Sequence, residues 1–154
     1  MKYTEAIVTF QEVPGEVSLT LSISGCPLRC MYCHSTHLRE DIGTPLTVQE
    51  LARLLEEQVS PHTNLLNVSC VCFLGGDQFK SDILPLLNFC KSQNLKTCLY
   101  TGRLSIDPEI LQHLTYIKYG PYDEVKGPLT SKTTNQRFIR VVDNADLTSQ
   151  FWSS

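Results

Sequence analysis

The sequence has no long apolar run and no cluster of basic charge. No apolar stretch approaches the roughly 20 residues that a membrane-spanning helix requires. The first residues, Met1 to Glu5, lack the apolar core of a signal peptide. The net charge is −3, and lysine and arginine form no run that would mark a nucleic-acid-binding surface. We therefore expect a cytoplasmic protein that binds neither a membrane nor a nucleic acid.

Internal repeats, low-complexity tracts and interdomain linkers are also missing from the chain. Hydrophobic residues make up 42% and charged residues 19% of the 154 positions, a composition typical of globular proteins. A chain of this length suits one folding unit. We expect residues 1–154 to form a single domain.

Cysteine, in contrast, is plentiful, with seven in the chain. Disulfides are rare in a reducing compartment, so clustered cysteines there indicate a metal site or catalysis. Three of the seven stand together in residues 26–33. The other four lie in apolar runs, and we expect them to be small buried hydrophobic residues: Cys70, Cys72, Cys90 and Cys98.

Strand patterns recur along the chain. Residues 17–23 alternate apolar and polar side chains, which is typical of a strand. Residues 67–74 form a short apolar run that predicts a buried strand, and residues 96–100 predict the next. Residues 116–119 and 138–142 are two further strand candidates.

Helix signals lie between these strands. Thr47 begins a capping box and predicts a helix that ends at Pro61. A second helix is expected over residues 81–92, with Pro85 in or near its first turn. Asp107, followed by proline, predicts the N-cap of a short third helix.

The alternation of strands and helices predicts an α/β fold built from βα units, with a mostly parallel sheet. There are too few units for a closed barrel of eight, so we expect an open, partial (βα) barrel. Such sheets bind their ligands at the carboxyl ends of the strands. The cysteine cluster, Gly75-Gly76-Asp77 and Thr101-Gly102 all follow predicted strands.

The cysteine cluster consists of Cys26, Cys30 and Cys33. A cubane cluster has four irons and normally takes four thiolates, so three thiolates leave one iron open. A metal with an open coordination position can bind a substrate. We expect these cysteines to hold one 4Fe–4S cluster, whose open iron the amine and carboxylate of a methionine could chelate.

Two other sites would use the same cysteines. Structural zinc could take His34 or His37 as a fourth ligand, since Cys3His sites suit zinc. An electron-transfer cluster could instead take Cys70 or Cys72 as its fourth thiolate.

The cysteine spacing after a strand, with Tyr32 before the last cysteine, resembles the signature of the radical S-adenosylmethionine (SAM) superfamily. The Gly75–Asp77 turn resembles the Gly-Gly-Glu-like motif with which that family binds the methionine amino group. The carboxylate is kept here but is one methylene shorter. Glycine lets a backbone approach the ligand, and carbonyl and carboxylate oxygens accept the ammonium hydrogens. The resemblance further implies that Tyr32 and His34 flank the adenine and that Thr101 contacts the nucleoside or the methionine.

Within the superfamily the chain resembles the activating proteins of anaerobic (class III) ribonucleotide reductase. The resemblance covers most of the chain, including residues 99–102, 116–122 and 133–138. It implies an oxidoreductase that reductively cleaves SAM to a 5′-deoxyadenosyl radical. This radical would take a Cα hydrogen from a glycine near the C-terminus of the reductase and leave a glycyl radical. The resemblance implies two partners, the reductase and a flavodoxin-like electron donor, and no catalytic residue beyond the cluster and SAM.

Chain length also favours a macromolecular substrate, because 154 residues leave little chain for a lid over the radical. Three alternatives remain at this point. The chain could activate another glycyl radical enzyme of the pyruvate formate-lyase type, or it could be a radical SAM enzyme that acts on a small molecule. The non-enzymatic alternative is a zinc-stabilised interaction module.

Overall fold

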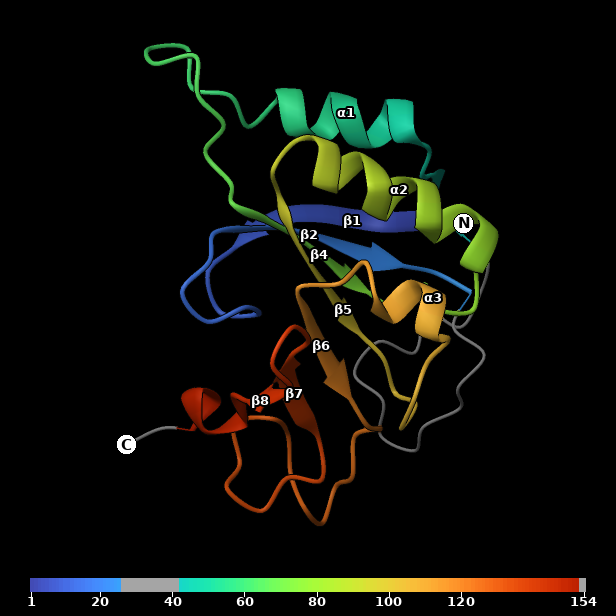
Figure 1. The fold of residues 1–154 in the computed structure, drawn as a ribbon, viewed down its shortest axis with the longest axis vertical. Coiled ribbons are helices and arrows are strands. Elements are labelled where there is room, and N and C mark those ends of the chain that lie inside the picture. The colour runs from blue at the N-terminus through green and yellow to red at the C-terminus, as the bar shows by residue number, and fades with distance from the viewer. Residues whose placement is uncertain (26–41, 153–154) are drawn as a thin grey trace.

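The computed structural model describes residues 1–25 and 42–152, and these form a single sheet with helices against it (Figure 1). The strands are β1 (Lys2–Thr9), β2 (Ser18–Ile23), β3 (Thr44–Pro45), β4 (Cys70–Leu74), β5 (Lys96–Tyr100), β6 (Tyr116–Tyr119), β7 (Arg137–Arg140) and β8 (Ala145–Asp146). The helices are α1 (Val48–Glu56), α2 (Lys80–Ser92) and α3 (Pro108–Leu111), with a 3-10 turn, η2 (Thr148–Phe151). None of the described helices is long and apolar enough to cross a membrane.

The strand order is β3-β1-β2-β4-β5-β6-β7-β8. The central strands β2, β4, β5 and β6 run parallel to one another, whereas β1, β3, β7 and β8 pair antiparallel. The sheet is therefore mixed, with a parallel centre and antiparallel flanks. The four parallel strands bring their carboxyl ends to one edge. The expected partial barrel stays a prediction.

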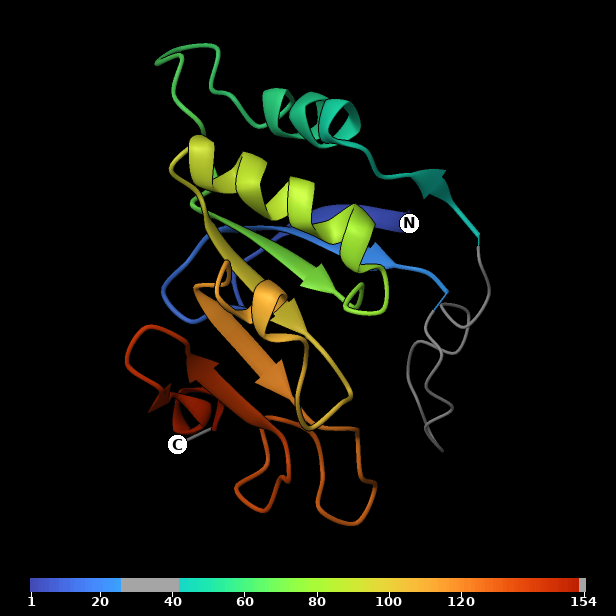
Figure 2. The same ribbon diagram turned by 45° about the vertical axis from the view of Figure 1, so that its right-hand side comes forward.

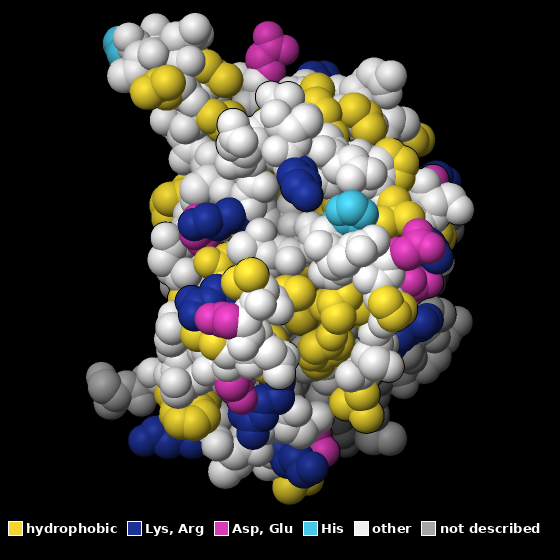
Figure 3. Space-filling model, viewed as in Figure 1, with side chains coloured by type: hydrophobic (Ala, Val, Ile, Leu, Met, Phe, Trp, Pro, Cys, Tyr) yellow, Lys and Arg dark blue, Asp and Glu magenta, His cyan; other side chains and the backbone are white. Residues whose placement is uncertain are grey.

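The helices lie across one face of the sheet, as both views show (Figure 1, Figure 2). Helix α2 packs on β5 and lies between α1 and α3. Leu51, Ile83 and Ile110, one from each helix, are fully buried against the strands. No α-helix lies between β6 and β7 in the described chain. Below the three helices, hydrophobic side chains are visible on this face of the molecule (Figure 3).

The opposite face of the sheet carries a second apolar cluster. Along β4 the side chains alternate, so that Val71 and Phe73 face the helices while Cys70 and Cys72 face away. The chain's own segments cover this second face, and the fully buried Phe138 ring lies 5.0 Å from that of Phe151, centroid to centroid. We call it the inner face.

Local sequence signals placed most helices correctly. The Thr47 hydroxyl accepts a hydrogen bond from the backbone N–H of Glu50 at 3.1 Å, as the capping box predicts. Asp107 caps α3 in the same way, with its carboxylate 2.9 Å from the N–H of Glu109. However, α1 ends at Glu56, so Pro61 does not end it.

Helix α2 corrects a second detail, because Pro85 lies inside the helix and not in or near its first turn. A proline there removes one intrahelical hydrogen bond. Both Pro85 and Ser81, whose carbonyl would accept that bond, are exposed, so water can replace the missing partner.

Candidate cofactor site at the sheet edge

The loops that follow β2, β4, β5 and β6 meet at the carboxyl edge of the parallel strands. They begin with Ser24, Gly75, Thr101 and Gly120. Predicted cluster and adenine residues follow Gly25 directly in the chain and lie outside the described residues: Cys26, Cys30, Tyr32, Cys33 and His34. Their roles stay predictions.

The Gly75–Asp77 turn has the backbone that its sequence predicts. Gly75 and Gly76 have φ angles of 95° and 112°, a region that L side chains rarely adopt. A Cβ at Gly76 would stand 3.1 Å from the Met1 sulfur and 3.4 Å from Ile83 Cδ1. Only glycine fits here without a shift, because the side chains of Met1 and Ile83 pack against the α-carbon of Gly76.

Asp77 places its carboxylate beside a cation. Its side chain is 7% exposed, and Oδ2 lies 3.5 Å from Nε of Arg103, which is 45% exposed. Backbone bonds hold the Arg103 residue on both sides, since its N–H donates to the Thr101 hydroxyl at 3.1 Å and its carbonyl accepts from the Gly120 N–H at 2.9 Å. A carboxylate and a guanidinium therefore stand side by side at the edge.

Thr101 is buried at the end of β5, and its polar groups are partly used by neighbours. Its N–H donates to the Lys118 carbonyl at 2.9 Å, while its hydroxyl oxygen accepts from Arg103. The structure gives Thr101 a role in holding its own turn. The ligand contact predicted for it is still untested.

Sequence reasoning missed three side chains at this edge. Gln78 Nε2 donates to the Gly25 carbonyl at 3.0 Å and joins the Gly75–Asp77 turn to the start of the cysteine loop. Arg103 pairs with Asp77, and the buried Lys118 donates to the Gly120 carbonyl at 3.0 Å. Gln78 could have been identified as a candidate from its position directly after the glycine turn. Arg103 gave no signal, because its partner Asp77 lies in another loop. Lys118 gave none, because it stands within an ordinary strand pattern.

The four remaining cysteines are fully buried, as predicted. Burial raises the pKa of the Cys70 and Cys98 thiols well above the usual range and that of Cys90 to about 12. A cluster ligand must be a thiolate, which burial disfavours. Within the described ranges no group of three or more His, Cys, Asp or Glu residues is placed to hold a metal. Burial therefore disfavours Cys70 as the fourth cluster ligand.

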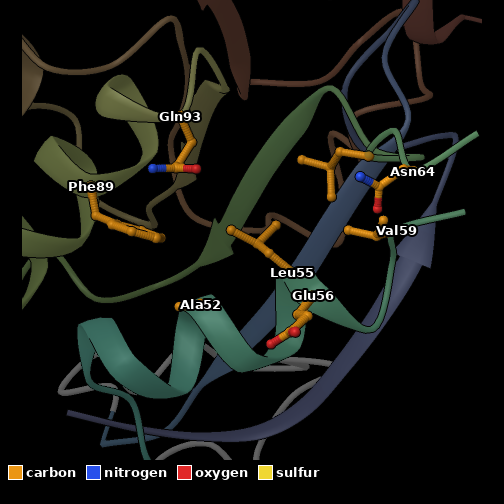
Figure 4. Close-up of a pocket in the computed structure, with 8 residues that line it drawn as sticks. Ala52, Leu55, Glu56, Val59, Asn64, Phe89 and Gln93 are labelled. Carbon is orange, nitrogen blue, oxygen red and sulfur yellow. The ribbon is translucent and has the colours of Figure 1, made fainter.

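A hollow of about 310 Å³ lies away from this edge (Figure 4). It is lined by residues of α1, of α2 and of the loop between α1 and β4: Ala52, Leu55, Glu56, Val59, Asn64, Leu66, Phe89 and Gln93. Glu56 is the one charged residue among them, so the hollow lacks the set of polar groups that chemistry would require.

Comparison with protein-family models gives a match. The family model of 4Fe-4S single cluster domains matches residues 13–141. The matched range contains the cysteine triplet, the Gly75–Asp77 turn and Thr101. A search of curated proteins found no match to the chain.

Proposed function

Because the chain belongs to the family of 4Fe-4S single cluster domains, we propose that it is a radical SAM activating enzyme. Cys26, Cys30 and Cys33 would hold the cluster. A bound, reduced cluster supplies the electron that splits SAM into methionine and a 5′-deoxyadenosyl radical. The substrate would be anaerobic ribonucleotide reductase, on which a glycyl radical is generated, and a flavodoxin-like protein would donate the electron.

One observation carries the proposal: the start of the cysteine loop and the Gly75–Asp77 turn are held against each other. The Gly25 carbonyl, which belongs to the peptide bond leading into Cys26, accepts a hydrogen bond from Gln78, the residue directly after the turn. A cluster on the cysteine loop would therefore stand near the Gly75–Asp77 turn, which we propose binds the methionine. This proximity supports the proposal that a methionine bound to an open iron would also contact the turn.

The pairing of Asp77 with Arg103 adds support for a methionine ligand. An α-amino acid carries an ammonium and a carboxylate on one carbon. A carboxylate beside a guanidinium offers an acceptor for the first and a donor for the second. Arg103 is nearly half exposed, so its guanidinium is accessible to a ligand carboxylate, while the more buried Asp77 lies at the turn.

The packing of the inner face favours a substrate that approaches the site from outside the sheet. Below the edge, this face is filled by the chain's own side chains, among them Val13, Leu129 and Phe138. A substrate would then meet the site at the carboxyl edge, which suits a loop of another protein better than an enclosed small molecule. We further propose that the sheet is an open partial barrel of the radical SAM type.

The test is anaerobic reconstitution with iron and sulfide, followed by addition of SAM, a reductant and the candidate reductase. We expect about four irons and four sulfides per chain, cleavage of SAM, and a glycyl doublet in the electron paramagnetic resonance (EPR) spectrum. Cys30→Ala is the control and should give none of the three.

Each possible result separates one alternative. One zinc without sulfide would contradict the enzyme and support the interaction module. Cleavage of SAM without a glycyl signal would contradict this substrate. A signal with pyruvate formate-lyase in place of the reductase would reassign the partner. A glycyl radical that forms on the reductase and not on pyruvate formate-lyase supports the proposal.

A further inference from the structure

We infer that Gln78 and Phe79 form a clamp on Gly25 and are positioning residues for the cluster. The inference rests on the assignment of the cluster to Cys26, Cys30 and Cys33 but not on SAM or the reductase. Gly25 is the last described residue before the cysteines. Both clamp residues come from the loop after β4, next to the Gly75–Asp77 turn.

Gly25 adopts a backbone that depends on its having no side chain. Its φ angle is 76°, in the left-handed region. A Cβ at this position would stand 3.0 Å from Cζ and 3.5 Å from Cε2 of the Phe79 ring. The aromatic ring therefore covers the α-carbon of Gly25 at close range.

Gln78 holds the other side of the same residue. Its side-chain amide donates to the Gly25 carbonyl over 3.0 Å. That carbonyl shares a planar peptide unit with the nitrogen of Cys26, so fixing its direction also fixes the plane from which Cys26 continues. We expect this hydrogen bond to constrain the backbone that leads into the first cysteine.

The clamp is itself anchored. The Phe79 N–H donates to the Gly76 carbonyl at 3.0 Å, and the Phe79 carbonyl accepts from the N–H of Ile83 at 2.9 Å. Ile83 belongs to α2, and its side chain is fully buried. On the other loop, the Ser24 N–H donates to the Lys2 carbonyl at 3.0 Å. Both sides of the clamp are thus tied to the sheet and the helical layer.

This arrangement links the two halves of the site mechanically. The backbone that would approach the methionine and the backbone that leads to the first cysteine share one set of contacts. Loss of the clamp should leave the fold in place and loosen the cluster. Its effect should therefore be visible in the bound cluster before any substrate is added.

The experiment compares Gln78→Leu and Phe79→Ala with matched variants elsewhere. Gln93→Leu and Phe89→Ala remove the same side chains from the far end of α2, where both residues line the hollow between α1 and α2. Each protein is reconstituted anaerobically, and the rate at which a ferrous-iron chelator strips the cluster is measured. The EPR spectrum of the reduced cluster and the melting temperature of the apoprotein are recorded alongside.

For Gln78→Leu we expect iron to be released up to about tenfold faster, the effect of losing one partly buried hydrogen bond, together with an altered EPR spectrum. The matched variants should release iron at the rate of the unmodified protein. A release rate and spectrum unchanged in both clamp variants would overturn the inference. If Gln78→Leu lowers the melting temperature of the apoprotein, the iron release rate and the EPR spectrum of Gln78→Glu, which also removes the amide donor, are used for the decision.

The results also separate this inference from the proposed function. A protein that holds its cluster through the clamp but forms no glycyl radical contradicts the proposed function alone. A protein that makes the glycyl radical but loses iron at the same rate in clamp and control variants contradicts the clamp alone. A protein that takes up no iron and sulfide contradicts both.

Discussion

At the scale of single residues, the surroundings of a cysteine decide whether its thiol can lose a proton and bind a metal. Cys90 lies on the buried side of α2, and burial raises the pKa of its thiol to about 12. A thiol in such a place stays protonated and packs like a small aliphatic group. The sequence allowed this division, because the four buried cysteines stand in apolar runs and the other three do not.

This division predicts opposite results for two alanine variants. Cys90→Ala should keep the cluster and SAM cleavage and lower the free energy of unfolding by about 1 to 2 kcal/mol, since it leaves a small cavity. Cys30→Ala should fold but hold no iron or sulfide. Iron and sulfide analysis and denaturant unfolding measure both. A folded Cys90→Ala protein without a cluster would contradict the packing role.

Asp77 is a second case in which the residue type and its contacts lead to a prediction. Asp77→Asn removes the charge that would face an ammonium and leaves Arg103 without its partner. SAM binding should weaken about 10- to 100-fold, the range for losing a charge-assisted hydrogen bond. Equilibrium binding of SAM to the reconstituted protein measures the change.

Asp143→Asn is the matched control for Asp77→Asn. Asp143 is also paired with an arginine, Arg140, but it lies in the turn between β7 and β8, beyond the opposite edge of the parallel strands. Its replacement should leave the affinity for SAM unchanged. Equal losses in the two variants would mean that Asp77 acts through general stability and not through the ligand.

At the scale of helices and strands, features that depend on neighbouring residues could be predicted from the sequence, and features that depend on distant residues could not. Helices α1 and α3 could be predicted because the capping side chain and its backbone partner lie within three residues of each other. Strand β1 was missed because its buried face depends on its pairing with β2 and shows no clean alternation in the sequence. The pair of Asp77 and Arg103 was missed because its two residues come from different loops and meet only in the folded chain.

The α1 cap gives a prediction about stability. Thr47→Ala should lower the free energy of unfolding by about 1 kcal/mol, because the Glu50 N–H loses its acceptor at the helix start. Thr47→Ser keeps the hydroxyl and should retain most of that stability. Denaturant unfolding of both variants provides the comparison, and equal losses in the two would contradict the capping role.

The same helix predicts a pH dependence. Hydrogen bonds from Arg53 and Tyr3 lower the pKa of Glu50 from 4.5 to about 2. A carboxyl whose pKa is lowered by folding adds stability above its unfolded pKa, and that stability is lost as the pH falls through the folded value. Glu50→Gln should therefore melt at a lower temperature than the unmodified apoprotein at pH 7.

The difference between Glu50→Gln and the unmodified apoprotein should shrink as the pH falls from about 5 toward 2, where the native carboxylate becomes protonated. Melting followed by circular dichroism at several pH values tests this course. A difference that stays constant with pH would show that Glu50 acts through packing rather than through its charge.

At the scale of the whole molecule, the sheet separates two apolar layers with different partners. Helices cover one layer, and irregular segments cover the inner face. The Phe138 backbone N–H donates to the Thr148 hydroxyl at 2.9 Å, so η2 is tied to the strand it covers. The carboxyl edge could be predicted from the order of strands and glycine turns. The covering of the inner face could not, because it joins residues far apart in the chain.

Phe138 tests whether this inner cover belongs to the cooperative fold. The side chain is fully buried and contacts aromatic rings of three other segments: Tyr100, Tyr116 and Phe151. Phe138→Ala should lower the free energy of unfolding by about 3 to 5 kcal/mol, the usual range for a buried phenylalanine. Phe10→Ala is the control, since Phe10 is 70% exposed and its loss should cost less than about 0.5 kcal/mol.

Urea denaturation gives both values. A small loss in Phe138→Ala would mean that the C-terminal segments rest on the sheet without stabilising it, and that the inner face can open to a substrate. A large loss would mean that the inner face stays closed while the protein is folded. The carboxyl edge would then be the route by which a partner reaches the site, as the proposed function requires.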